Sequence, residues 1–351
     1  MKTLDLDYQL PEALIAAQPA ERRDGARLLV VDGDALIDST IEALATLIPE
    51  RALVVVNDTR VRRARVFGAR KGSGGRIEVL FIRRLSSLGD GRERWEAIGR
   101  SSKPLRAGTV IEWDEVSIEV LDKSADATLL VAVDAGGKDF ERVLEERGHL
   151  PLPPYMRRSD ELADLERYQT VYARRTASAA APTAGLHLTP ALFERLRERN
   201  VRVARLELEI GLGTFRPVTA ADLDDHPMHA ETLEVGEDLV AAVAGARERG
   251  APVVAVGTTV VRALESAADP ARPGHVATMR GETRLLIQPG YRFQVVDALL
   301  TNFHVPQSTL LALVSAFAGH QRVMAAYRHA VAARYRFLSY GDAMWIPRRR
   351  A

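Results

Sequence analysis

Hydrophobic positions follow two patterns along the chain, and the two patterns predict two kinds of domain. A continuous apolar run over 53–56 predicts a strand that is buried on both faces. Between about 62 and 135, apolar residues instead alternate with polar ones, as over 77–81 and 116–120, and glycine-containing breaks separate these stretches. Short alternating strands joined by glycine turns are typical of a small β-barrel or sandwich, so we expect a β domain in this part of the chain.

The rest of the chain predicts a layered α/β domain. A helix is expected over 140–147, with Gly148 at its C-terminal end. Strands are expected over 201–210 and 253–256, and further helices over 191–200, 239–250, 260–268, 309–318 and 322–333. A strand of the same type precedes the β domain, so we expect an α/β core domain of 1–61 and 136–351 that carries an inserted β-barrel of 62–135.

A polar stretch, 301–309, directly precedes one of these predicted helices. Ser308 occupies the position of a helix N-cap, and Asn302 and His304 lie shortly before it. A helix N-terminus offers free N–H donors and a positive dipole end, so it can hold an anionic or polar ligand and should keep the His304 ring neutral. The stretch predicts either part of a ligand site or a well-capped core helix with one hydrogen-bonded histidine.

Gly257, Thr258 and Thr259 follow the predicted strand at 253–256 and open a helix. Ligands of α/β folds bind at such carboxyl ends of strands, so this stretch is the stronger candidate for a binding site. Arg262 lies in the first turn of the helix, where it faces the ligand or forms an i,i+3 surface pair with Glu265.

Two glycine-containing loops give weaker signals. His187 lies in a loop of small residues that leads to a helix start at Thr189 and Pro190, where the backbone can approach a ligand or simply turn. The stretch from Gly211 to Phe215 follows a strand, but it lacks the third glycine of a dinucleotide-binding fingerprint.

Two further stretches carry groups that can exchange protons. His229 and Glu231 belong to the stretch 226–231, in which Pro227 and the spacing disfavour a metal site and favour a polar pocket loop. The stretch 336–344 is dense in aromatic and polar residues, so we expect the C-terminal segment to dock onto the fold.

Composition adds a local charge and several exclusions. The chain has 351 residues, a net charge of +1 and no cysteine, which excludes disulfides and cysteine-ligated metals and fits a reducing cytoplasm. The first ten residues contain no apolar run, so no signal peptide is expected, and no stretch reaches a membrane-spanning length. Between Arg60 and Arg106, however, fourteen Lys and Arg face four acids, which indicates either a polyanion-binding face or an ordinary solvated surface.

Taken together, these stretches resemble the S-adenosylmethionine:tRNA ribosyltransferase-isomerase family of queuosine biosynthesis. The resemblance extends from Leu10 to Met344 and rests on long motifs in one order. They are found at 57–61, 73–80, 148–155, 167–173, 181–187, 257–259, 301–304 and 339–344.

The resemblance implies an enzyme that transfers the ribosyl part of S-adenosylmethionine to a 7-aminomethyl-7-deazaguanine base. That base would stand at the wobble position of a tRNA with a GUN anticodon. Adenine and methionine would leave, and the ribosyl unit would become an epoxycyclopentanediol. The family implies an α/β domain with an inserted barrel and S-adenosylmethionine as co-substrate. We expect no metal and no membrane, and a cytoplasmic monomer.

We draw the candidate residues from these stretches. The proton carriers are His187, His229, Glu231, His304 and Asp342, which the sequence does not rank. The substrate-binding candidates are Asn57, Asp58, Thr59, Arg60, Thr183, Gly185, Gly211, Gly213, Thr214, Gly257, Thr258, Thr259, Arg262, Asn302 and Tyr340. The tRNA-binding candidates are Arg76, Arg83, Arg84 and Lys103. Because the stretches at 57–60, 211–214, 257–259 and 301–304 each border a buried strand, we expect them to meet in one cleft.

The chain departs from the family pattern at several positions. Glu209 stands where the family has a histidine, Arg62 and Arg63 stand for Ile-Pro, Leu188 for Phe, and Gln307 for Glu. Glu209 leaves two alternatives open. The chain could act on a free deazapurine or nucleoside, or it could be a tRNA-binding protein without turnover.

Overall fold

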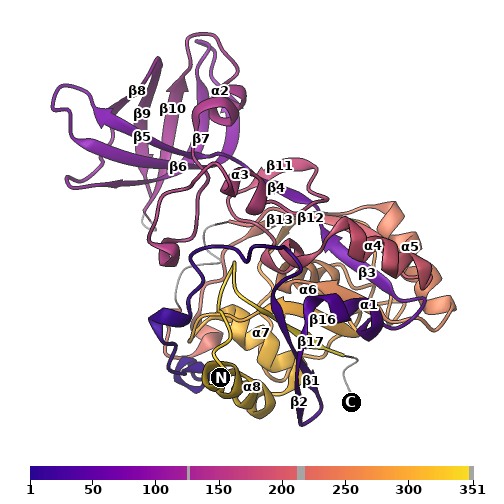
Figure 1. The fold of residues 1–351 in the computed structure, drawn as a ribbon. Helices are drawn as coiled ribbons and strands as arrows, with labels where there is room; N and C mark the ends of the chain where they lie inside the picture. The colour runs from indigo at the N-terminus through magenta and orange to yellow at the C-terminus, as the bar shows by residue number, and fades with distance from the viewer. Residues whose placement is uncertain (125–126, 212–217, 348–351) are drawn as a thin grey trace.

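The structure is a computed structural model that describes residues 1–124, 127–211 and 218–347 (Figure 1). The larger part has helices on both faces of a nine-stranded mixed sheet, and the smaller part is a closed barrel that projects from it (Figure 1). The predicted fold class, an α/β domain that carries a small β-barrel, is therefore confirmed.

Four parallel strands form the centre of the large sheet. In spatial order the sheet contains β15 (Met279–Thr283), β13 (Glu231–Val235), β12 (Arg202–Leu208), β3 (Leu53–Asn57), β14 (Val253–Val256), β16 (Ala298–Asn302), β17 (Ala343–Ile346), β1 (Arg27–Asp32) and β2 (Ala35–Thr40). Neighbours from β12 to β16 pair in parallel, and β3, β14 and β16 are buried throughout. Because these strands are parallel, the segments that follow them emerge at one edge of the sheet.

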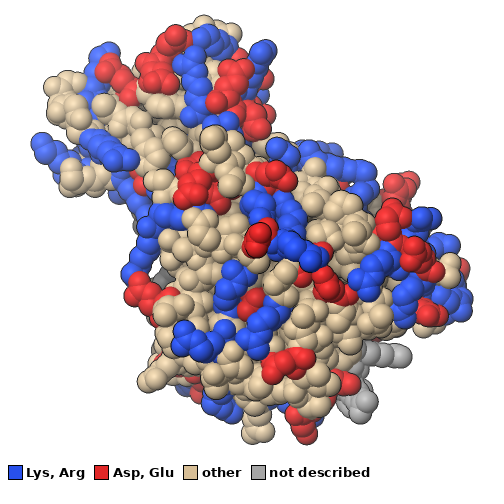
Figure 2. Space-filling model, viewed as in Figure 1, with Lys and Arg blue, Asp and Glu red and all other residues tan. Residues whose placement is uncertain are grey.

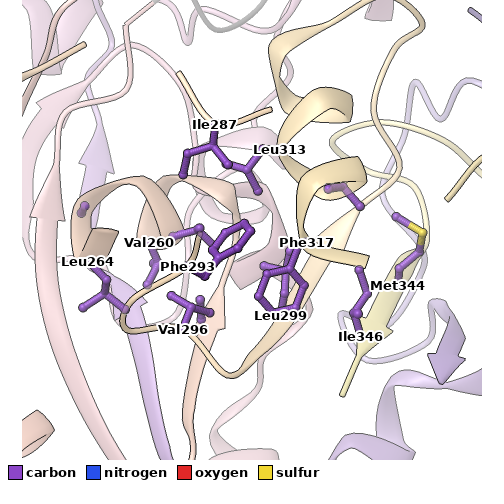
Figure 3. Packing of buried hydrophobic residues seen from close by; sticks show 14 of the residues in the cluster. Val260, Leu264, Ile287, Phe293, Val296, Leu299, Leu313, Phe317, Met344 and Ile346 are labelled. Atoms are coloured by element: carbon purple, nitrogen blue, oxygen red, sulfur yellow. The ribbon is translucent and has the colours of Figure 1, made fainter. Parts of the chain in front are cut away.

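Helices cover both faces of this sheet. They are α1 (Leu44–Leu47), α4 (Pro190–Glu198), α5 (Glu237–Glu248), α6 (Thr258–Ser266), α7 (Thr309–Ala318) and α8 (His320–Ala332), whereas α3 (Asp164–Arg167) packs in a separate small cluster. Alternate residues of β3 face opposite sides: Val55 packs in the cluster that contains α5 to α8, and Val54 in the cluster that contains α1 and α4. In Figure 3, Val260 of α6 lies beside Phe293, while Phe317 of α7 lies over Leu299 of β16.

The predicted helices are confirmed, with small differences at their ends. The helix from 309 to 318 has the predicted bounds, and α4, α5, α6 and α8 begin one or two residues earlier than expected. The C-terminal segment docks as expected, because β17 inserts between β16 and β1. The β1–β2 hairpin and the strands β13 and β15 at the other end of the sheet were not predicted.

The barrel closes in the order β10 (Thr128–Asp134), β7 (Glu93–Ser101), β6 (Arg76–Ser87), β5 (Arg65–Arg70), β8 (Val110–Trp113) and β9 (Val116–Lys123). Helix α2 (Phe140–Arg147) packs against it: the ring of Phe140 lies 4.8 Å from that of Phe81 and 5.5 Å from that of Trp95. The predicted domain boundary at 135 stays a prediction, although the core of the barrel includes residues beyond it.

Gly148 ends α2 for a different reason from the expected one. Its φ of −70° is not the left-handed conformation of a glycine C-cap. A Cβ at this position would lie 2.0 Å from the carbonyl oxygen of Arg63, so the close approach of two backbone segments requires glycine.

The barrel and the sheet meet at a short parallel pair, β4 (Thr59–Val61) and β11 (Arg175–Ser178). The side-chain oxygens of Thr59 and Ser178 lie 2.7 Å apart in this pair and are buried. The chain therefore leaves the end of β3 for the barrel through a segment that is itself hydrogen-bonded to the core domain.

Candidate functional site

A cavity of about 80 Å³ opens at the carboxyl ends of β14 and β16. We call it the α6 cavity, because the first residues of α6 form one wall. Its lining includes Tyr155, Thr183, Ala184, Ile210, Gly257, Thr258, Thr259, Thr301, Asn302, Phe303, His304, Leu310, Leu338 and Ser339. Two of the four stretches expected to meet in one cleft, 257–259 and 301–304, thus line a single cavity, together with Thr183.

The stretch 57–60 does not join them. The Asn57 side chain is fully buried and ties β3 to β12, because its amide donates to the carbonyl oxygen of Leu208 and its oxygen accepts from the backbone N–H of Leu208. The hydroxyl group of Thr59 bonds to Ser178, and neither Asp58 nor Arg60 lines the α6 cavity. The expectation of a single cleft is wrong for this stretch, whose buried polar groups satisfy the backbone instead.

Two glycine candidates for substrate binding, Gly185 and Gly211, do not line the α6 cavity either. Gly211 lines a second, larger cleft, whereas Gly213 and Thr214 lie outside the described residues. Gly185 has a packing role, because a Cβ there would lie 2.0 Å from the hydroxyl oxygen of Tyr172.

The amide of Asn302 holds the cavity wall together. It is 2% exposed, and its nitrogen donates to the carbonyl oxygen of Leu338 at 3.1 Å and to Nε2 of His187 at 3.3 Å. Three distant segments therefore meet at the end of β16: the C-terminal segment, the short helix that contains His187, and the strand itself. Oδ1 of Asn302 has no hydrogen-bond partner among the described residues.

His304 and His187 are both held in the neutral form. Burial lowers the pKa of His304 to about 3. Burial, with a contribution from the charge of Arg336, lowers the pKa of His187 to about 4. This shift agrees with the neutral ring expected for His304, and burial is its cause. Nε2 of His304 lies 2.9 Å from the hydroxyl oxygen of Thr301, and the ring lines the α6 cavity.

The two helix N-termini at this edge differ. Ser308 caps α7, since its hydroxyl oxygen accepts from the N–H of Leu311, as the sequence predicted. Helix α6 begins after Gly257, which has a φ of 93° and provides no side-chain cap. The free helix N-terminus is therefore that of α6, and the stretch 301–309 contributes its side chains rather than its helix.

A second hollow, of about 490 Å³, lies where the barrel meets the core domain. We call it the interdomain cleft. It is lined from the barrel by Ile82, Arg83, Glu96, Asp122, Ser124, Thr128, Leu129 and Leu130, and from the core by Ala177, Ala179, Glu209, Ile210, Gly211, His229, Ala230, Glu231, Thr232, Glu282 and Arg284. Ile210 lines both the interdomain cleft and the α6 cavity, so the two hollows adjoin at this residue.

Two departures from the family pattern lie at this junction. Burial lowers the pKa of the Arg62 guanidinium, and the carboxylates of Glu141 and Glu209 act against that effect. The charges of Arg62 and Glu209 therefore interact, and the acidic residue at 209 faces the interdomain cleft.

Glu231, which lines the interdomain cleft, forms a buried ion pair with Arg262 of α6. The side chains are 5% and 8% exposed, and Arg262 also donates to the carbonyl oxygen of Leu285. The alternative of an Arg262–Glu265 surface pair is wrong, because Glu265 is buried and accepts from the backbone N–H groups of residues 294–296. His229 lines the cleft beside this pair.

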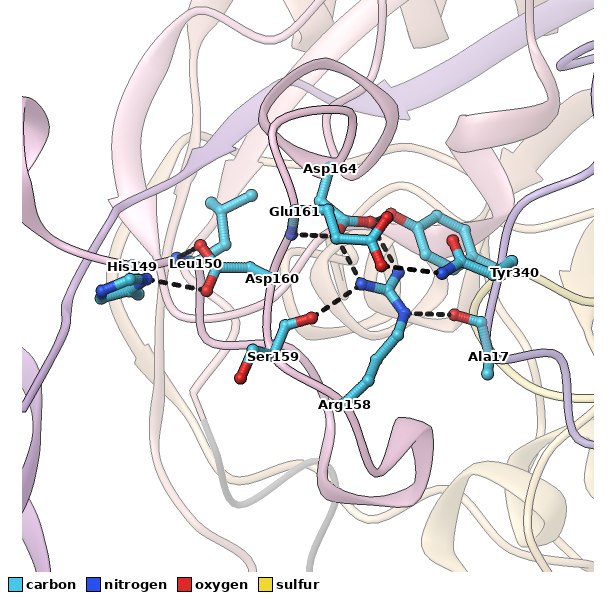
Figure 4. Close-up of polar contacts among 10 residues, drawn as sticks. Ala17, His149, Leu150, Arg158, Ser159, Asp160, Glu161, Asp164 and Tyr340 are labelled. Carbon is cyan, nitrogen blue, oxygen red and sulfur yellow. Dashed lines mark hydrogen bonds and ion pairs between the residues drawn. The ribbon is translucent and has the colours of Figure 1, made fainter.

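Asp342 and Tyr340 have structural partners. Asp342 is 2% exposed, and its two oxygens accept from the backbone N–H groups of Arg27 and Arg336 at 2.9 and 2.7 Å. The hydroxyl of Tyr340 donates to Asp164, which a bidentate pair with Arg158 also holds (Figure 4). Neither side chain lines the α6 cavity or the interdomain cleft.

The basic segment is interrupted by acids. In Figure 2, red side chains lie among the blue ones over the barrel. Arg83 pairs with Glu96 and with Glu282 of the core domain, and Arg84 pairs with Glu93. Two other predicted tRNA contacts, Arg76 and Lys103, are exposed, and they have no ion pair within the described part of the chain.

Sequence reasoning missed Tyr155 and Ser339 as cavity residues. Both lie in motifs that carried the family resemblance, but only the fold brings them together, with their hydroxyl groups hydrogen-bonded. Among the described residues, no group of three or more His, Asp and Glu could hold a metal ion, and no helix is long and apolar enough to cross a membrane.

These features define a class of protein: an α/β protein with a ligand cavity at the carboxyl ends of parallel strands and an inserted barrel beside it. A family model described as queuosine biosynthesis protein matches residues 3–346. A protein of Sorangium cellulosum named S-adenosylmethionine:tRNA ribosyltransferase-isomerase is 54% identical, over 97% of each chain. One of the same name from an Anaeromyxobacter species is 47% identical, over 99% of each.

A solved structure agrees with this similarity. The crystal structure of an S-adenosylmethionine tRNA ribosyltransferase from Thermotoga maritima has 33% sequence identity and a TM-score of 0.54, and the match covers 97% of this chain and 99% of that one. This chain belongs to the queuosine biosynthesis protein family.

The two neutral histidines predict a loss of stability in acid. The pKa of each is below its ordinary value of 6.5, so the unfolded chain takes up the protons first as pH falls. Keeping the two rings neutral therefore costs the folded chain nothing above pH 6.5, and it lowers the free energy of unfolding progressively as the pH falls below 6.5. Between pH 7 and pH 5 we expect each histidine to lower the free energy of unfolding by about 2 kcal/mol. Denaturant titrations of the wild type and of His304→Gln measure this, and an equal pH dependence in both would contradict it.

Proposed function

We propose that this protein is an S-adenosylmethionine:tRNA ribosyltransferase-isomerase. It transfers the ribosyl part of S-adenosylmethionine to the aminomethyl group of a 7-deazaguanine at the anticodon wobble position, and it releases adenine and methionine. The observation that supports this most strongly is the α6 cavity, in which uncharged hydroxyl, amide and imidazole groups converge beside a cleft between the domains. The full-length similarity to proteins of this name supports the same reaction.

In this proposal His304 and Thr301 serve proton transfer. A sulfonium makes the neighbouring C5′ protons acidic, and a neutral ring next to a hydroxyl group can accept such a proton or relay it. His304 fits this role best because it lines the α6 cavity, whereas Nε2 of His187 already accepts from Asn302. Thr258, Thr259 and Asn302 are the substrate-binding groups of the cavity.

The acceptor would enter through the interdomain cleft. Arg83 pairs with Glu96 and Glu282 in its lining, which leaves Asp122 and Glu209 as the carboxylates that suit a cationic aminomethyl group. His229 and Glu231 lie on the same wall, where they can take part in binding the acceptor. The acidic lining fits a free deazapurine as well as a base in tRNA, so the acceptor needs a direct test. We place the reaction in the cytoplasm, where tRNA and S-adenosylmethionine meet, and we propose a monomer that needs no metal.

Mass spectrometry of a single incubation tests the function. The full chain is mixed with S-adenosylmethionine and with both acceptors, tRNA that carries the aminomethyl-deazaguanine base and the free base itself. We expect free adenine and methionine, and a tRNA whose mass increases by the transferred ribosyl unit. Adenine release with a labelled free base but without labelled tRNA would instead favour the small-molecule acceptor. No adenine from any acceptor would contradict the proposal and favour a binding protein.

A variant at His304 tests the proposed proton relay. We expect His304→Ala to lose at least roughly 100-fold in turnover, at the lower end of the range for general acid–base groups, while the chain stays folded. Turnover and melting temperature are measured in parallel. Near-normal turnover would reject the role, and so would a collapse of folding that accounts for the whole loss.

Arg76 and Lys103 test the barrel as a tRNA contact. Each phosphate contact releases counterions, so the double variant Arg76→Gln, Lys103→Gln should weaken tRNA binding and reduce the salt slope by about two. Arg83 and Arg84 should change the slope less, because glutamates already pair with them. Arg328→Gln, an exposed arginine on α8, is the matched control. An unchanged slope in the Arg76/Lys103 variant would argue against contact through the barrel.

A further inference from the structure

The N-terminus of α6 has no side-chain cap. Gly257 provides no side chain to cap the helix, so the first N–H groups of α6 face the α6 cavity without a capping oxygen. Such N–H groups, together with the positive end of the helix dipole, favour a carboxylate or a phosphate. Helices α4 and α7 differ, since Thr189 and Ser308 accept from their N–H groups.

The Thr259 hydroxyl group gives a second, independent indication of a ligand. The residue is 7% exposed and lines the α6 cavity, yet its oxygen has no hydrogen-bond partner among the described residues. An unpaired buried hydroxyl group costs free energy, and a bound acceptor would remove that cost. The hydroxyl of Thr259 and the helix N–H groups can both donate to the same anion.

Asn302, at the end of β16, offers an acceptor in the same cavity. The nitrogen of the Asn302 amide donates to the carbonyl oxygen of Leu338, which fixes the orientation of the amide and leaves Oδ1 unpaired. The cavity thus combines donors for an anion with a fixed acceptor for a cationic N–H group. A group with both a carboxylate and an ammonium, as at the end of an α-amino acid, matches this combination.

The size and charge of the α6 cavity limit the kind of ligand that it can hold. At about 80 Å³, the α6 cavity has room for the end of a ligand rather than for a whole nucleoside. No Lys, Arg, Asp or Glu is among the described residues that line it, so a zwitterion with no net charge suits it better than a phosphate does. Arg262 lines a separate small cavity, and Glu231 neutralises it.

We propose that the α6 cavity binds the α-amino acid end of S-adenosylmethionine. The carboxylate accepts from the N–H groups at the start of α6 and from the Thr259 hydroxyl group, and the ammonium donates to Oδ1 of Asn302. The sulfonium and the ribose then extend past Ile210 towards the interdomain cleft, where the acceptor enters. This inference rests on the proposed function, because it assumes S-adenosylmethionine as the substrate.

Calorimetry with two ligands tests it. The probes are S-adenosyl-L-methionine and its decarboxylated analogue, which lacks only the carboxylate. We expect the wild type to bind the analogue at least roughly tenfold more weakly, as loss of a hydrogen bond to a charged group predicts. In Thr259→Val, the affinity for S-adenosylmethionine should fall by roughly tenfold, and that for the analogue should change little. Thr259→Ser should bind both ligands as the wild type does, and so should Thr46→Val, which changes an exposed threonine on α1.

Different results would overturn the carboxylate site and the proposed enzyme activity. Equal affinity of the two ligands for the wild type, or an equal loss of both in Thr259→Val, would overturn the carboxylate site and leave the enzyme activity standing. If Thr259→Val does not fold, the comparison of the two ligands on the wild type decides alone. Failure of S-adenosylmethionine to bind, together with no adenine release, would overturn the proposed function itself.

Discussion

The structure depends on how it satisfies buried polar groups at the carboxyl end of β16. Asn302 is almost fully buried there, and an amide in such a position must find hydrogen-bond partners or destabilise the fold. Its nitrogen finds them on two segments that lie far away in the sequence, at Leu338 and His187. The amide thus fixes the C-terminal segment and the loop before α4 against the sheet, and the α6 cavity lies where these segments meet. The hydrogen bonds of the amide nitrogen fix the Asn302 side chain and leave its Oδ1 unpaired, so this oxygen can accept a hydrogen bond from a ligand.

Different groups at this edge of the sheet suit ligand binding and proton transfer. Helix α6 has no side-chain cap, whereas Ser308 caps α7, so only one of two neighbouring helix N-termini is open to an anion. Burial keeps the pKa of His304 low enough for a neutral ring at physiological pH, next to the hydroxyl group of Thr301. The barrel contributes the far wall of the interdomain cleft. A small substrate held on the core domain could therefore face a large acceptor that approaches between the two domains.

Much of this fold could be predicted from periodicity, because buried parallel strands and amphipathic helices leave strong local signals. The helices at 140–147 and 309–318 have their predicted bounds, whereas the β1–β2 hairpin was missed: β1 is a buried apolar run like that of β3, but the largely exposed β2 shows no regular alternation. The site was predicted only in part. The stretches at 257–259 and 301–304 meet as expected, but Asn57 satisfies the backbone of β12, a long-range contact that no local pattern reveals. Likewise, Asp342 carries a carboxylate of the kind that acts in catalysis. Only the fold shows that both of its oxygens accept hydrogen bonds from backbone N–H groups.

The most direct test of this account is a crystal structure of the chain with S-adenosylmethionine bound. We predict ligand density in the α6 cavity, with hydrogen bonds to Thr259 and Asn302 and with the ribose directed past Ile210 into the interdomain cleft. The side chain of His304 should then lie within reach of the C5′ carbon. A ligand bound on another face, with the oxygens of Thr259 and Asn302 still unpaired, would contradict the account.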